Sequence, residues 1–143
     1  IDASFLKPCG VYTLDMLKDF GHKNGEIGEG DIILFHFGWE EKYGLGAAAE
    51  DFLKDWPGLS GDAAQYLLQK KVKAVGTDAL ALDPFGSEDY PSHYILLGNG
   101  VLIIENLTNL HKLPVFSYVI GLTNKVKDGS ASPIRATAFT DKG

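Results

Sequence analysis

The stretch H-Y-I-L-L-G-N-G-V-L-I-I-E-N-L-T-N-L, residues 93–110, decides how the rest of this chain is interpreted. It places His93 beside an apolar run, breaks that run at a Gly-Asn-Gly turn, and ends a second apolar run with Glu105. The second run, residues 101–104, consists of β-branched residues and leucine, which favours a buried strand. A carboxylate at the end of a buried strand is costly unless it is paired, hydrogen-bonded, protonated or bound to a metal. Glu105 therefore needs a partner.

His93 is a candidate partner only if the chain turns between the two residues. One straight helix would separate them by roughly 18 Å, and one continuous strand by roughly 40 Å. The Gly-Asn-Gly sequence at residues 98–100 accepts positive φ and lets the chain double back. A short helix at residues 94–97 followed by a strand at residues 101–105 would allow the two side chains to meet.

The rest of the chain alternates helical and strand patterns. Thr13 is suited to cap a helix that ends at Gly21, and Ser60 is suited to cap a longer one. Helices are expected at residues 13–20, 47–54 and 61–70, and strands at residues 31–37, 72–75, 115–122 and 134–140. Because helices and strands are interleaved, the pattern predicts a layered α/β or α+β domain.

Composition excludes several classes of function. A length of 143 residues is enough for one domain with a real core. The formal net charge of −6 argues against nucleic acid or an anionic membrane surface as a partner, and no apolar run approaches the roughly 20 residues that span a bilayer. The single cysteine, Cys9, cannot form an internal disulfide. We therefore expect a reducing, cytoplasmic location.

Several segments, taken in order, resemble the cyclase family of metal-dependent hydrolases, whose members include kynurenine formamidases and isatin hydrolases. Besides the opening stretch, the matching segments are G-D-I-I-L-F-H-F-G-W at residues 30–39, P-G-L-S at 57–60, V-G-T-D at 75–78 and G-S-A-S-P-I-R-A at 129–136. The resemblance implies an α/β fold with a layered mixed sheet, a β-barrel-like core and flanking helices, which is the swivelling β/β/α arrangement. It also implies a homo-oligomer.

The resemblance further implies a divalent metal, zinc or manganese. The family holds it with an early His-x-Gly-Thr-His-x-Asp motif and a later histidine and glutamate, which correspond to His93 and Glu105. By the same analogy Glu105 is also catalytic, because one carboxylate oxygen can bind the metal while the other orients or deprotonates water. The early motif does not occur in this chain, and its place would lie before Ile1. We therefore expect residues 1–143 to be the C-terminal part of a single cyclase-like hydrolase domain, with the remaining ligands, and the family's acid/base histidine, outside it.

Other candidate residues have competing interpretations. His36 and Trp39, at the end of a predicted strand, are candidates for a substrate pocket. For His36 a hydrogen-bonded core histidine is the stronger interpretation, and for Trp39 packing is as good an interpretation as substrate contact. Asp78 is expected to fix a turn. His22 and His111 lie in polar contexts and are expected to be solvated.

Two functions follow from these residues. The first is hydrolysis of a small-molecule substrate, an amide, formamide or cyclic lactam or lactone, by metal-activated water. As this fragment alone, such an enzyme could be inactive, because two protein ligands are fewer than the three of usual catalytic zinc sites. The alternative is a metal-free, non-catalytic homologue or fragment that acts in binding or assembly.

Overall fold

Three parallel strands form the centre of the N-terminal part of this protein. They are β2 (Ile32–Phe35), β4 (Ala74–Thr77) and β5 (Leu102–Ile104), in the order β2-β4-β5. The structure is a computed structural model that describes residues 1–140, and it divides into two compact units, Ile1–His111 and Lys112–Gly143. Because the three strands are parallel, their carboxyl ends lie at one edge of the sheet, where α/β proteins commonly place ligand-binding residues.

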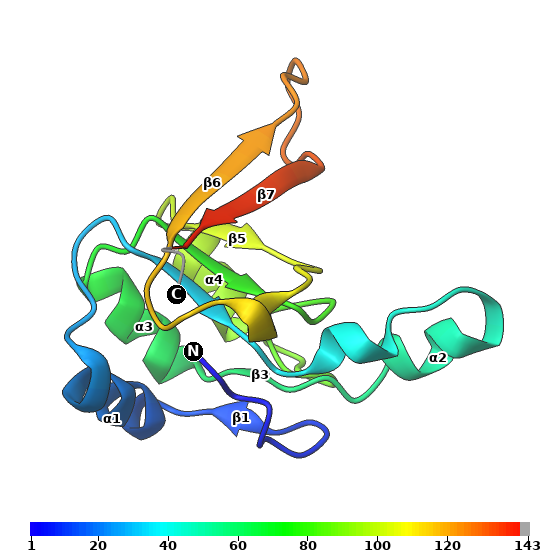
Figure 1. Ribbon diagram of the computed structural model, residues 1–143, viewed down its shortest axis with the longest axis horizontal. Helices are drawn as coiled ribbons and strands as arrows, with labels where there is room; N and C mark the ends of the chain where they lie inside the picture. The colour runs from blue at the N-terminus through cyan, green and yellow to red at the C-terminus, as the bar shows by residue number, and fades with distance from the viewer. Residues whose placement is uncertain (141–143) are drawn as a thin grey trace. The chain divides into compact units, whose positions relative to one another are not determined.

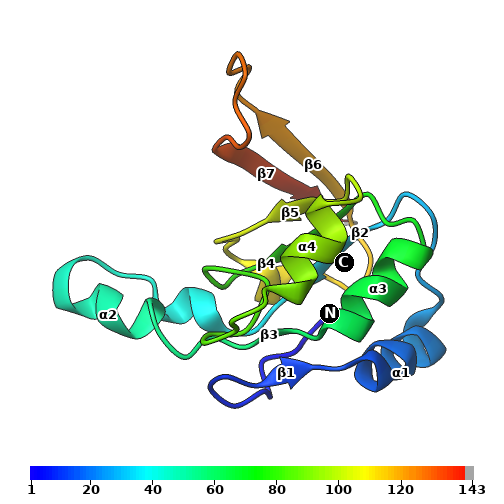
Figure 2. The same ribbon diagram turned by 180° about the vertical axis from the view of Figure 1, so that it is seen from behind.

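Helices α3 (Gly61–Gln69) and α4 (Pro91–Leu97) cover one face of this sheet, and α1 (Leu14–Asn24) lies beside α3 (Figure 2). Ser60 caps α3 as predicted, because its hydroxyl accepts a hydrogen bond from the Ala63 N–H. The apolar faces of the three helices bury one leucine each completely: Leu17, Leu67 and Leu96. Burial of these side chains in the hydrophobic core stabilises the first unit.

Shorter elements complete the first unit. A two-stranded parallel pair joins β1 (Val11–Tyr12) to β3 (Gly58–Leu59). After β2, the 3₁₀ turns η1 (Trp39–Lys42) and η2 (Gly46–Ala48) lead into α2 (Ala49–Phe52), which extends away from the sheet (Figure 1). A third 3₁₀ turn, η3 (Leu110–Lys112), follows β5.

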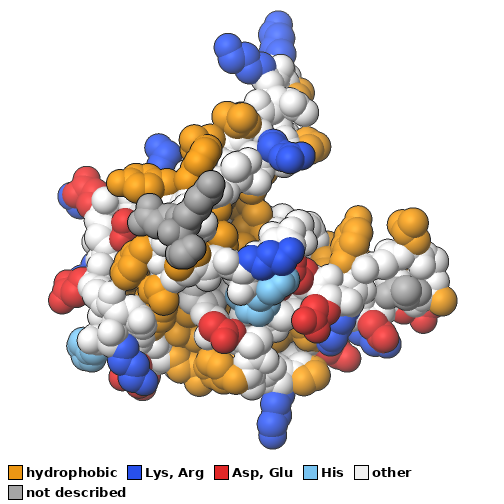
Figure 3. Space-filling view, in the orientation of Figure 1, with side chains coloured by type: hydrophobic (Ala, Val, Ile, Leu, Met, Phe, Trp, Pro, Cys, Tyr) orange, Lys and Arg blue, Asp and Glu red, His pale blue; other side chains and the backbone are white. Residues whose placement is uncertain are grey.

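The second unit is an antiparallel hairpin of β6 (Tyr118–Thr123) and β7 (Ile134–Phe139). It carries several exposed large apolar side chains: Tyr118, Ile120, Leu122 and Phe139. Figure 3 shows hydrophobic side chains along it. A hairpin of two strands is marginally stable in water when it stands alone, so these side chains are suited to contact with further protein.

The mixed α/β class is as the sequence predicts, but the β-barrel-like core is absent from residues 1–140. The described strands form sheets of two, three and two strands, and closing a sheet into a barrel needs more strands, tilted and staggered to match. No helix among the described residues is both long and apolar enough to cross a membrane.

Most predicted boundaries were wrong by one to three residues: for example, α4 begins at Pro91 rather than at residue 94, and β6 begins at Tyr118 rather than at residue 115. The first helix continues through Gly21 to Asn24, because Gly21 keeps the helical conformation and Gly25, with a φ of 112°, ends the helix. The strand predicted at residues 72–75 begins and ends two residues later, at Ala74–Thr77.

Candidate metal centre

His93 lies in the first turn of α4, and its ring is placed between two carboxylates. The His93 Nδ1 atom is 2.6 Å from Asp83 Oδ2, and the His93 Nε2 atom is 3.2 Å from Glu105 Oε1. The turn between α4 and β5 therefore brings together the two residues that the sequence placed twelve positions apart. Their role as metal ligands stays a prediction.

Asp83 fixes the position of the His93 backbone as well as its ring. Tyr90, which precedes α4, provides no side-chain cap. The Asp83 carboxylate takes over this role, because Oδ1 accepts a hydrogen bond of 2.8 Å from the Ser92 N–H and Oδ2 accepts one of 3.1 Å from the His93 N–H. The Ser92 hydroxyl in turn donates to the Leu59 carbonyl. A buried carboxylate from a preceding loop thus determines where α4 begins and where the imidazole points.

The surroundings of His93 favour its charged form in the absence of a metal. Hydrogen bonds to Asp83 and then to Glu105 raise the pKa of His93 to about 9, against the opposing effect of burial. Burial would raise the pKa of Asp83, but hydrogen bonds from His93 and from the Ser92 N–H outweigh it and hold that pKa below its usual range. At neutral pH the cluster is therefore an imidazolium between two carboxylates.

The same arrangement fits a divalent metal. A ligating histidine must be neutral, and a carboxylate that accepts its Nδ1–H leaves the lone pair on Nε2. Here the Asp83 carboxylate meets Nδ1 and the Glu105 carboxylate faces Nε2. Two donor atoms about 3 Å apart are suitably spaced to bind one ion with bonds of about 2.0–2.2 Å. As ligands the pair would number two, and a catalytic zinc site usually needs three from protein.

The other residues singled out from the sequence lie near the end of β2. Trp39 is buried, and its indole N–H donates to the Phe52 carbonyl at 3.0 Å, so it packs α2 against η1. Asp78 fixes a turn, as expected, because its buried carboxylate accepts hydrogen bonds from the Phe37 and Trp39 N–H groups at 2.8 and 2.7 Å. Neither side chain touches the His93 cluster through a hydrogen bond given by the structure.

His36 agrees with the stronger of its two interpretations, whereas His111 differs from the expectation. The His36 Nδ1 atom is 3.5 Å from Asp2 Oδ1 and its side chain is mostly buried, so it is a partnered histidine. His111 is half-exposed rather than simply solvated, because its Nδ1 atom is 2.8 Å from Glu40 Oε1. Sequence reasoning missed Asp83, Glu40 and this pairing of His111, since each contact joins segments whose spatial order the sequence does not give.

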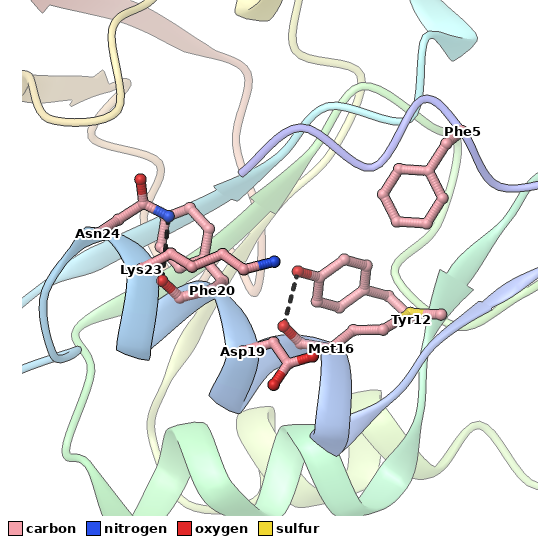
Figure 4. Close-up of a pocket in the computed structure, with 7 residues that line it drawn as sticks. All are labelled: Phe5, Tyr12, Met16, Asp19, Phe20, Lys23 and Asn24. Atoms are coloured by element: carbon pink, nitrogen blue, oxygen red, sulfur yellow. Dashed lines mark hydrogen bonds between the residues drawn. The ribbon is translucent and has the colours of Figure 1, made fainter.

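A surface pocket of about 280 Å³ lies elsewhere in the first unit, between α1 and the segment that leads to β1 (Figure 4). Its lining is mainly aromatic and aliphatic with one acid and one lysine: Phe5, Tyr12, Met16, Asp19, Phe20, Lys23 and Asn24. Burial, followed by the nearby Asp19 charge, raises the pKa of Tyr12 to about 12, so its hydroxyl stays protonated. The pocket includes no predicted site residue, and its lining lacks a metal ligand set.

Comparison with known proteins places this chain in a family. Residues 1–84 match the family model named "Putative cyclase". The isatin hydrolase of Roseibium aggregatum is 32% identical to this chain over 94% of the chain and 54% of its own length. The kynurenine formamidase of Bacillus cereus is 29% identical over 92% of the chain and 62% of its own length. The chain thus spans about half to three-fifths of the length of these relatives.

Solved structures give the same result for the fold. The crystal structure of an isatin hydrolase bound to the product analogue thioisatinate superposes with a TM-score of 0.91 at 31% identity, over 99% of this chain and 58% of that one. A potential metal-dependent hydrolase with cyclase activity superposes with a TM-score of 0.68 at 26% identity, over 98% of this chain and 68% of that one.

Proposed function

The chain belongs to the cyclase family, and from that membership we propose that it is part of a metal-dependent hydrolase of a small amide, formamide or cyclic lactam or lactone. The observation that carries the proposal is the convergence of His93 Nε2 and Glu105 Oε1, with Asp83 behind the ring. The names of the similar proteins, isatin hydrolase and kynurenine formamidase, support a small cyclic amide or a formamide as the substrate.

We propose that His93 and Glu105 are two of the metal ligands and that the others come from protein outside residues 1–143. A bound divalent ion supplies a water molecule with a pKa of about 7 and polarises the substrate carbonyl. Zinc and manganese both accept imidazole and carboxylate ligands.

The residues of this chain have separate roles in that scheme. Asp83 accepts the Nδ1–H of His93, which fixes the tautomer and orients Nε2. Glu105 lies on the Nε2 side of the ring, where its carboxylate can accept a proton from the attacking water. Its side chain is about one-third exposed, so a substrate can approach it from solvent.

The test uses the full-length gene product that contains this chain. Its zinc and manganese content is measured, followed by its hydrolysis of isatin and of the formamide of kynurenine. Glu105→Gln is expected to lower metal content and to reduce kcat/KM by about 100-fold or more, which exceeds the roughly 10- to 100-fold loss typical of an outer-shell partner. Glu50→Gln, an exposed change on α2, is the matched control and should leave both unchanged.

The outcome also decides the alternative function. A full-length protein that binds no metal and hydrolyses neither compound would favour a non-catalytic role in binding or assembly. Homo-oligomerisation is part of the same proposal, and light scattering of the full-length protein tests it independently of activity.

A further inference from the structure

A second group of metal-ligand side chains lies at the carboxyl edge of the sheet, around the end of β2. His36, Glu40 and His111 each offer one ligand atom, and these three atoms lie within 4.8 Å of one another. The three residues come from the end of β2, from η1 and from η3. Figure 3 shows a histidine surface at the centre of one face with acidic side chains beside it.

Each of the three side chains is held in place by its own surroundings. His36 sits on a backbone that is paired on both sides, since its N–H donates to the Ile1 carbonyl and its carbonyl accepts from the Ala3 N–H. Glu40 is nearly buried, and its carboxylate accepts hydrogen bonds from the Asn109 N–H and the Thr108 hydroxyl. This preorganisation lowers the entropic cost of assembling a site.

A second carboxylate lies beside this group. Asp2, at 3.5 Å from His36 Nδ1, adds an acceptor that can orient this ring in the way that outer carboxylates orient metal-binding histidines.

We propose that His36, Glu40 and His111 form a second site, which binds a divalent transition-metal ion of the zinc class with solvent in the remaining position. Two imidazoles and one carboxylate are a known ligand set for zinc, with bonds of about 2.0–2.2 Å. In a tetrahedral site, such bonds place the donor atoms about 3.4 Å apart, so atoms that now lie up to 4.8 Å apart must approach one another by at most about 1.4 Å. Side-chain rotation of the half-exposed His111 provides that movement.

This site is distinct from the His93 cluster. Strand β4 lies between β2 and β5, so the backbones of His36 and Glu105 are roughly 10 Å apart. Phe35 pairs with Thr77, and Gly76 pairs with Ile104. If this pairing continues by one residue, Glu105 pairs with Thr77 and therefore lies level with Phe35. His36 lies one residue beyond that level. Because successive side chains point to opposite faces, His36 and Glu105 do not share an ion.

The test removes one site at a time from this chain. In a Glu105→Gln background, which disables the first site, equilibrium dialysis should still find one Zn²⁺ bound per chain. Adding His111→Ala should weaken that binding by at least about tenfold. As a control, His22→Ala is added instead of His111→Ala. His22 is an exposed histidine on α1, so this change should leave the affinity for Zn²⁺ unchanged. Circular dichroism verifies that each variant is folded.

A second measurement needs no variant of the site itself. On addition of Zn²⁺ to the Glu105→Gln chain, the imidazole NMR signals of His36 and His111 should shift together, while that of His22 should not. Equal Zn²⁺ affinity with and without His111→Ala, or unshifted signals of His36 and His111, would overturn the proposal.

Discussion

The raised pKa of His93 predicts a specific pH dependence of stability in the metal-free protein. The perturbation is His93→Gln, which removes the titratable ring while Asp83 keeps its hydrogen bonds from the Ser92 and His93 backbone N–H groups. The pKa of His93 is about 9 in the folded chain, against the ordinary value of 6.5. At 1.36 kcal/mol per pKa unit, this difference corresponds to about 3 kcal/mol. Solvent screening at the partly exposed Glu105 reduces it to about 2 kcal/mol.

The sign follows from linkage. A group whose pKa is raised on folding contributes stability that is fully present below its unfolded pKa and is lost as the pH rises through its folded pKa. The contribution of His93 is therefore complete below pH 6.5 and disappears as the pH rises through about 9. The gap in unfolding free energy between wild type and His93→Gln should shrink by about 2 kcal/mol between pH 6 and pH 9.5.

The assay is urea denaturation in the presence of a chelator, at both pH values, together with an NMR titration of the His93 ring. Glu105→Gln should lower the NMR pKa of His93, and Asp83→Asn should lower it further, because the Asp83 hydrogen bond is the larger cause of the elevation. The reasoning would be refuted if the difference in unfolding free energy between wild type and His93→Gln did not change with pH. It would also be refuted if the His93 ring titrated near pH 6.5.

Four further predictions concern metal binding and the backbone. Because His93 is protonated at pH 7.5 and must be neutral to ligate, Zn²⁺ binding at that site should release about one proton per ion, measured by calorimetry in two buffers of different ionisation enthalpy. Asp78→Asn should cost about 3 kcal/mol of unfolding free energy, measured with urea, since its buried carboxylate accepts three backbone N–H groups. Gly58→Ala should destabilise the protein by about 2 kcal/mol or more, because a Cβ at residue 58 would lie 2.2 Å from Pro84 N. Gly21→Ala should instead stabilise the protein by about 0.5–1 kcal/mol, because a Cβ at this position in α1 would meet open space.

Local signals in the sequence were sufficient to find most elements. Thr13 and Ser60 mark helix starts because their hydroxyls satisfy backbone donors, and the apolar runs mark β2 and β5. Gly21 misled because a glycine can also continue a helix, at a cost of about 1 kcal/mol relative to alanine. Residues 98–100 mattered most, since a turn there is the one local feature that makes the meeting of His93 and Glu105 possible.

The partners of the site residues could not be read in the same way. Asp83 lies in a loop ten residues before His93, a spacing with no helical or strand period. Glu40 and His111 are 71 residues apart in sequence. They meet because Glu40 follows β2 and His111 follows β5, and the carboxyl ends of these two strands lie at the same edge of the sheet. That both strands belong to one sheet, in the order β2-β4-β5, is known only from the structure. The sequence predicted the strands without predicting this order.

The charges of the His93 cluster explain how a proton and a metal ion would compete for it. Asp83 and Glu105 carry two negative charges, and the imidazolium between them leaves a net charge of −1 in the metal-free state. A divalent ion beside a neutral imidazole would bring the same cluster to zero. Because the proton must leave Nε2 first, metal affinity at this site should rise about tenfold per pH unit and level off near pH 9, the pKa of His93. Asp83 takes part in both states: its hydrogen bond stabilises the imidazolium, and after deprotonation the same bond keeps the remaining proton on Nδ1 and the lone pair directed at Glu105.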